Sequence, residues 1–137
     1  MSMEVDFKTK ISGLDPKARE WFATALVGMV LADGDIDRSE MDFLLKMIQM
    51  VPDPVVVDRL KKFIQFKTVP PLGKPVGIER KVGMSMIIDL IRVAVSDQDF
   101  DKKEKELVAA IGSSLGFRDE EVDKLVLYGF EIMTKAN

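Results

Sequence analysis

An acidic segment that occurs twice constrains the fold of this chain more than any other feature. The two copies are Asp33-Gly34-Asp35-Ile36-Asp37-Arg38-Ser39-Glu40 and Asp97-Gln98-Asp99-Phe100-Asp101-Lys102-Lys103-Glu104. Their four acidic positions recur at a constant offset of 64 residues (97 − 33), with an apolar residue at the same place in both. Each copy follows an apolar run and precedes an amphipathic run with the three-and-four spacing of a helix. Such self-similarity predicts two related helix–acidic loop–helix units.

The spacing of the apolar residues predicts an all-α protein. The expected helices cover about residues 16–32, 38–50, 54–66, 78–96, 102–114 and 119–135, and a short helix or arm over 4–12 would be a seventh element. Asp15-Pro16 and Asp53-Pro54 are typical of helix starts, and Gly116 is typical of a helix end. No stretch alternates with a period of two, so no sheet is expected.

We expect a single-domain helical bundle of about six or seven helices over residues 1–137. The two units cover about 15–66 and 78–135, and a linker with three prolines and two glycines, residues 67–77, joins them. Neither unit alone carries enough apolar surface to bury its own helices. A chain of 137 residues suffices for one core and is marginal for two.

Composition excludes several kinds of chemistry. The chain has no cysteine and no histidine, which removes disulfides, thiolate catalysis, imidazole bases and His- or Cys-bound zinc. Its net charge of −3 gives no basic footprint for nucleic acid. No glycine-rich phosphate-binding pattern is present, so no organic cofactor is expected. The first residues lack a signal-peptide core and no uncharged apolar run could span a bilayer, so we expect a cytoplasmic protein without a transmembrane segment.

Helix capping explains part of each acidic segment. Asp37 and Asp101 are suited to cap the helices that follow, and Glu40 and Glu104, three residues later, complete capping boxes. On this interpretation the segment is a helix–turn–helix corner and nothing more.

The remaining aspartates favour a metal site. Asp33 and Asp97 lie near the negative ends of the preceding helices, where a carboxylate is disfavoured. Asp35 and Asp99 have no capping role. Close carboxylates repel each other by about 1 kcal/mol per pair in water, and a hard cation between two adjacent loops would offset that repulsion. The candidate ligands are Asp33, Asp35, Asp37, Glu40, Asp97, Asp99, Asp101 and Glu104.

An all-oxygen ligand set of this kind favours Ca²⁺ or Mg²⁺. The segments are not EF-hand loops, although both open with aspartates at alternate positions. An EF-hand needs glycine at its sixth position and glutamate at its twelfth. Here the sixth position is Arg38 or Lys102, and the glutamate comes at the eighth.

Asp89 and Arg92 are the charged pair inside the very apolar predicted helix 78–96. Their spacing lets them interact along one side of a helix. A buried ion pair or an exposed polar strip explains them more simply than a functional role, which is the remaining alternative.

The doubled motif resembles the tellurite-resistance TerB-like family. The resembling residues are 32–37 with Glu40, 95–101 with Glu104, and Leu115-Gly116-Phe117 before the last helix, and the resemblance covers roughly residues 15–135. It implies an all-helical bundle with both acidic loops at one end and a divalent metal on the eight carboxylates named above. It also implies a bacterial intracellular protein of the tellurite or general stress response, working with membrane-associated complexes. A related domain begins a membrane-anchored J-domain co-chaperone.

The leading hypothesis is therefore a non-enzymatic stress-response domain. It would bind a divalent cation, a protein partner or both through the doubled acidic loop, in the cytoplasm or at the surface of the inner membrane. Two alternatives stay open: a metal-dependent hydrolase that uses the acidic cluster, and a purely structural interaction module without metal. The chain shows no evident nucleophile or base beyond its carboxylates, which disfavours the hydrolase.

Overall fold

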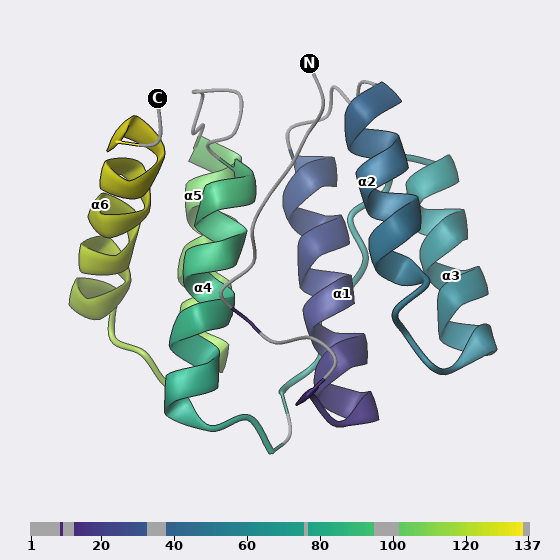
Figure 1. Ribbon diagram of the computed structural model, residues 1–137, viewed down its shortest axis with the longest axis horizontal. Coiled ribbons are helices and arrows are strands. Elements are labelled where there is room, and N and C mark those ends of the chain that lie inside the picture. The colour runs from purple at the N-terminus through teal and green to yellow at the C-terminus, as the bar shows by residue number, and fades with distance from the viewer. Residues whose placement is uncertain (1–8, 10–12, 33–37, 76, 95–101, 136–137) are drawn as a thin grey trace.

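The structure, a computed structural model, describes residues 9, 13–32, 38–75, 77–94 and 102–135. Within them the chain forms six α-helices and no strand, which confirms the all-α helical bundle (Figure 1). The helices are α1 (Pro16–Ala32), α2 (Arg38–Ile48), α3 (Pro54–Gln65), α4 (Arg80–Ala94), α5 (Lys102–Ser114) and α6 (Asp119–Lys135). Among these helices, none has the length and the apolar character needed to cross a membrane.

Helices α1 and α4 lie side by side at the centre of the bundle. Helices α2 and α3 pack on α1, while α5 and α6 pack on α4, and α1 also contacts α5 (Figure 1). The starts of α1 and α4, and those of α2 and α5, are each 64 residues apart (80 − 16 and 102 − 38). The offset of the acidic segments therefore extends to the helices that flank them.

Helix α1 is buried on nearly all sides. Every residue from 21 to 31 is buried, because α1 contacts four other helices. Apolar residues all around a helix are typical of such a central position. The same core contains Leu44 of α2, Ile87 of α4 and Ile111 of α5, so both predicted units contribute to it.

Two predicted helix starts are confirmed by their capping hydrogen bonds. The backbone N–H of Ala18 donates to Asp15 Oδ1 at 2.9 Å, and that of Val55 donates to Asp53 Oδ1 at 3.0 Å. The helix expected from residue 78 begins instead at Arg80, after Gly77 has turned the chain with a φ of 68°. Only glycine adopts that conformation without strain.

Two helices end in the same hydrogen-bond pattern. After α5, the N–H of Phe117 donates to Gly112 O at 2.9 Å, and Gly116 has a φ of 87°. After α3, the N–H of Thr68 donates to Phe63 O at 3.0 Å, and the left-handed residue is Lys67, with a φ of 53°. Both ends are Schellman motifs, but the second lacks the glycine that such a position favours.

Replacing Lys67 with glycine should raise the free energy of unfolding by about 0.5–1 kcal/mol. The left-handed conformation strains any residue that has a Cβ atom, and glycine removes that strain. Urea unfolding followed by circular dichroism measures the change. Lys62→Gly, at an exposed position inside α3, is the matched control and should lower stability by about 1 kcal/mol. Loss of stability in both variants would contradict the argument.

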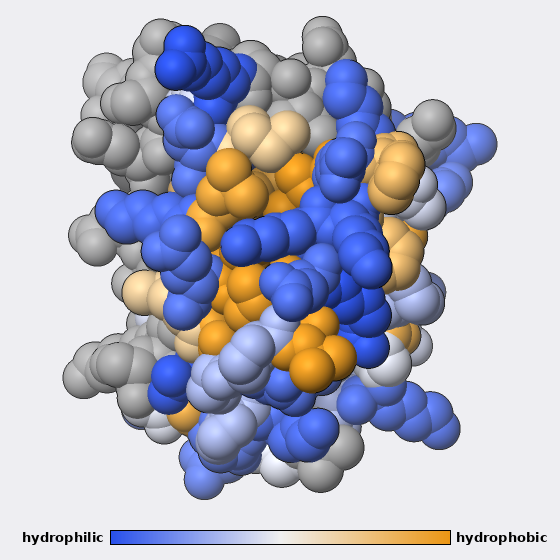
Figure 2. Space-filling view, turned by 90° about the vertical axis from the view of Figure 1, so that its right-hand side faces the viewer, coloured by the Kyte–Doolittle hydropathy of each residue, from blue (hydrophilic) through white to orange (hydrophobic). Residues whose placement is uncertain are grey.

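Apolar side chains are exposed on the side of the bundle formed by α2 and α3. Figure 2 shows them there, between long charged side chains. Val55 and Phe66, at the two ends of α3, are 74% and 70% exposed, and Leu45 of α2 is partly exposed. Single exposed apolar residues are ordinary, so only their combination with a hollow would mark a binding site.

Candidate functional site

Most of the predicted metal ligands lie outside the residues that the structure describes. The six aspartates of the acidic segments are in this group: Asp33, Asp35, Asp37, Asp97, Asp99 and Asp101. Glu40 and Glu104 are described, each in the first turn of its helix, α2 or α5. The described residues contain no group of three acidic side chains close enough to hold a metal ion. A metal site on these ligands therefore requires residues of the two loops.

The helix ends that carry the acidic segments lie at one end of the bundle. Figure 1 shows the end of α1, the start of α2, the end of α4 and the start of α5 at the top of the molecule. Ala32, which precedes Asp33, lines the same open cavity as Glu106 and Leu107 of α5. This cavity has a volume of about 570 Å³. The end of α1, where the first acidic segment begins, is therefore a neighbour of α5, the helix that follows the second acidic segment.

The two described glutamates differ in burial. Glu104 is only 3% exposed, whereas Glu40 is half-buried. A carboxylate that is almost removed from water needs hydrogen bonds, a cation or a metal around it. The two copies of the motif are thus not equivalent around their last acidic residue.

Asp89 and Arg92 form a buried ion pair, which decides between the two interpretations of these residues. Asp89 has no exposed surface, and Arg92 Nη1 lies 4.0 Å from Asp89 Oδ1. The backbone N–H of Thr9 donates to Asp89 Oδ2 at 2.8 Å. The carboxylate therefore fixes residue 9 against α4, although the two residues are 80 positions apart.

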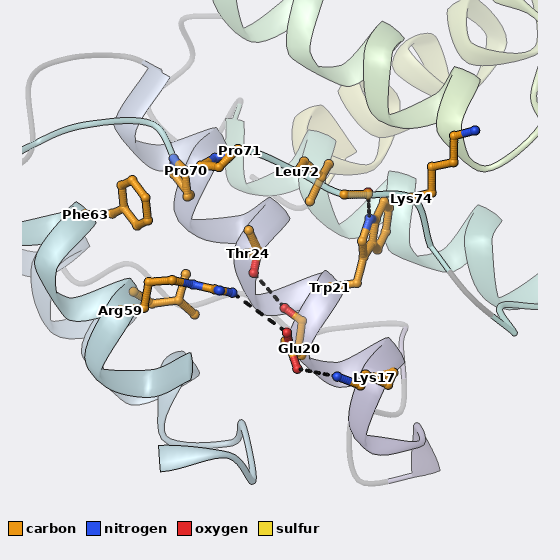
Figure 3. Close-up of a pocket in the computed structure, with 12 residues that line it drawn as sticks. Lys17, Glu20, Trp21, Thr24, Arg59, Phe63, Pro70, Pro71, Leu72 and Lys74 are labelled. Atoms are coloured by element: carbon orange, nitrogen blue, oxygen red, sulfur yellow. Dashed lines mark hydrogen bonds and ion pairs between the residues drawn. The ribbon is translucent and has the colours of Figure 1, made fainter. Parts of the chain in front are cut away.

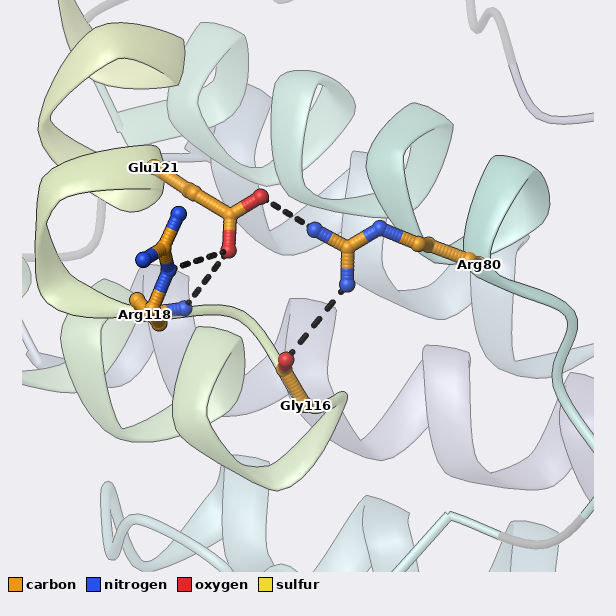
Figure 4. Close-up of polar contacts among 4 residues, drawn as sticks. All are labelled: Arg80, Gly116, Arg118 and Glu121. Atoms are coloured by element: carbon orange, nitrogen blue, oxygen red, sulfur yellow. Dashed lines mark hydrogen bonds and ion pairs between the residues drawn. The ribbon is translucent and has the colours of Figure 1, made fainter.

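A second polar cluster joins the start of α4 to the start of α6 (Figure 4). The Glu121 carboxylate accepts hydrogen bonds from the Arg118 backbone N–H at 3.1 Å and from the Arg80 guanidinium. These bonds, that from Arg118 first, lower the pKa of Glu121 below its usual value. Arg80 also lies 4.4 Å from the centre of the Phe117 ring. The cluster lies at the surface and joins α4 to α6.

The linker between the two units forms the wall of a cavity that sequence reasoning did not foresee. A hollow of about 430 Å³ lies between α1, α3 and residues 70–74 (Figure 3). Trp21 Nε1 donates to Gly73 O at 2.7 Å and so holds the linker over α1. The only sequence signals for it are the Pro70-Pro71 pair followed by Leu72, and the single tryptophan of the chain.

Comparison with protein-family models, with curated proteins and with solved structures finds no match. The resemblance to the TerB-like family, and the function it implies, stay predictions from the sequence.

Proposed function

We propose that this chain is a non-enzymatic helical domain that binds one divalent cation, Ca²⁺ or Mg²⁺, between its two acidic segments. The bound cation would prepare this end of the bundle for a protein partner. The eight predicted carboxylates would supply the ligands. The likeness to the TerB-like family adds a role in a bacterial stress response, at a membrane-associated complex.

The neighbouring stems of the two acidic segments carry this proposal. Ala32 and Glu106 line one cavity, so the chain enters the first segment beside the helix that leaves the second. Glu104, an acidic residue in the first turn of the helix that leaves the second segment, is buried. A cation that neutralises several such groups at once is favoured over separate counter-ions, because hard cations take six to eight oxygen ligands.

Calcium or magnesium should raise the melting temperature of the protein. A ligand that binds only the folded state stabilises it by about 2.7 kcal/mol at a concentration about 100 times its Kd. Thermal unfolding and calorimetric titration with each cation measure the effect. The double variant Asp35→Asn/Asp99→Asn should lose the response, and without cation it should be more stable than the parent protein by roughly 1 kcal/mol, because repulsion is relieved.

The matched control is Asp58→Asn/Asp123→Asn, which makes the same charge change at exposed positions of α3 and α6. It should keep the full response to the cation. Absence of any response at millimolar calcium and magnesium would contradict the proposal. An equal loss in both double variants would show that only the net charge matters, and would also contradict it.

A further inference from the structure

The cavity beneath the linker has the composition of a binding site. Apolar side chains form most of its lining, from Trp21 of α1, Phe63 of α3 and Pro70, Pro71 and Leu72 of the linker (Figure 3). Its volume of about 430 Å³ lies within the range of ligand pockets, which are mostly apolar with a few polar groups at the edge.

The walls of this cavity are held in place before any ligand arrives. The Trp21 side chain is only 7% exposed, and its indole N–H is bonded to the Gly73 carbonyl. The Pro70-Pro71 pair limits the backbone freedom of the linker, which forms another wall of the cavity. Such preorganisation lowers the entropic cost of binding.

The edge of the cavity is positively charged on an acidic protein. Lys17 and Arg59 face one carboxylate, that of Glu20, and Lys74 lies further along the edge, so the charged residues there sum to +2 while the whole chain has −3. Glu20 lies 3.8 Å from both the Lys17 and the Arg59 nitrogens. These distances exceed the usual length of a hydrogen bond, so the two cations retain donors for a further partner.

A second hollow continues the cavity along α3. It shares Arg59 and Phe63 with the first, and adds Lys62, Thr68 and the strongly exposed Phe66. Together the two hollows make an apolar surface with four cations and one carboxylate at its edge.

We infer that this surface, lined by α1, α3 and residues 70–74, is a docking groove for an acidic peptide segment that carries apolar anchor residues. The anchors fill the hollow beside Trp21, and the acidic residues pair with Lys17 and Arg59. Charge complementarity selects the acidic partner. A concave hollow suits an inserted side chain, whereas a membrane surface is bound by apolar residues that protrude. The inference is independent of the proposed cation site.

Trp21 is the only tryptophan of the chain and lines the groove, so its fluorescence reports binding there. The probe is a short synthetic peptide, blocked at both ends, in which two leucines are flanked by runs of glutamate. Two counterparts carry lysine in place of glutamate, or serine in place of leucine. The glutamate–leucine peptide should change the fluorescence saturably and bind less tightly as salt rises. Neither counterpart should bind.

Lys17→Glu should weaken binding of the glutamate–leucine peptide at least about tenfold, through reversal of a charge at the groove. Lys124→Glu makes the same change at an exposed position of α6 and should leave the affinity unaltered. No response to this peptide, or equal binding of the lysine counterpart, would overturn the inference. A response to vesicles of anionic lipid without one to the peptide would assign the surface to membranes instead.

Discussion

Replacing Arg92 with methionine should lower the free energy of unfolding by about 3 kcal/mol. Methionine keeps the packing of the arginine stem and removes the charge and the hydrogen-bond donors of the guanidinium. Asp89 has no contact with water and would lose the guanidinium 4.0 Å from its carboxylate. Breaking a buried ion pair by removing one partner typically costs about 3–5 kcal/mol, and the hydrogen bond from Thr9 that remains places this pair at the lower end. Urea unfolding followed by circular dichroism measures the loss.

A second substitution separates the charge from the packing. In the double variant Asp89→Asn/Arg92→Met the amide oxygen still accepts the hydrogen bond from Thr9, and neither member of the pair is charged. The double variant should therefore be more stable than Arg92→Met alone, by about 1–2 kcal/mol, since the cost of the uncompensated charge disappears. A double variant that is less stable than the single one would contradict this account of the pair.

The helices could be predicted from the sequence because their limits are set locally. Asp15-Pro16 and Asp53-Pro54 start helices through the residues' own side chains and backbone, and Gly116 ends one by its conformation. Helix α2, expected to end at residue 50, ends at Ile48. The chain makes turn hydrogen bonds there before Pro52, and a proline disfavours helix just ahead of it. Lys67 shows the limit of such rules, since no local signal marks a lysine for a left-handed conformation.

The surroundings of a side chain could not be predicted in the same way. The spacing of Asp89 and Arg92 allows a buried pair or an exposed strip, and only the packing of the bundle and of residue 9 decides between them. In the sequence, the linker has the pattern of a simple connection. Its contact with Trp21 joins residues 52 positions apart, and no local pattern predicts such a contact. For the acidic site, the repeat predicts which carboxylates belong together. The six aspartates lie outside the described residues, so the ligand set stays a prediction.

Gly112→Ala should lower the free energy of unfolding by up to about 2 kcal/mol, although alanine is the better helix former. Helices α5 and α6 approach so closely at this point that a Cβ atom on residue 112 would lie 2.4 Å from Val122 Cγ2. Val122 is buried and branched at Cβ, so its side chain has little freedom to turn away. Overpacking of this kind costs about 1–3 kcal/mol and outweighs the gain of about 1 kcal/mol in helix propensity.

Gly28→Ala is the control that isolates this clash. Gly28 also lies inside a buried helix, but an added Cβ would meet only Val69 at 3.6 Å and Leu107 at 3.7 Å, which are ordinary contacts. This variant should be as stable as the parent protein or gain up to about 1 kcal/mol. The clash also predicts coupling: with Val122 already shortened to alanine, Gly112→Ala should cost nothing further. If Gly112→Ala lowers the free energy of unfolding equally with valine and with alanine at position 122, the Val122 side chain is not what excludes a Cβ atom at position 112.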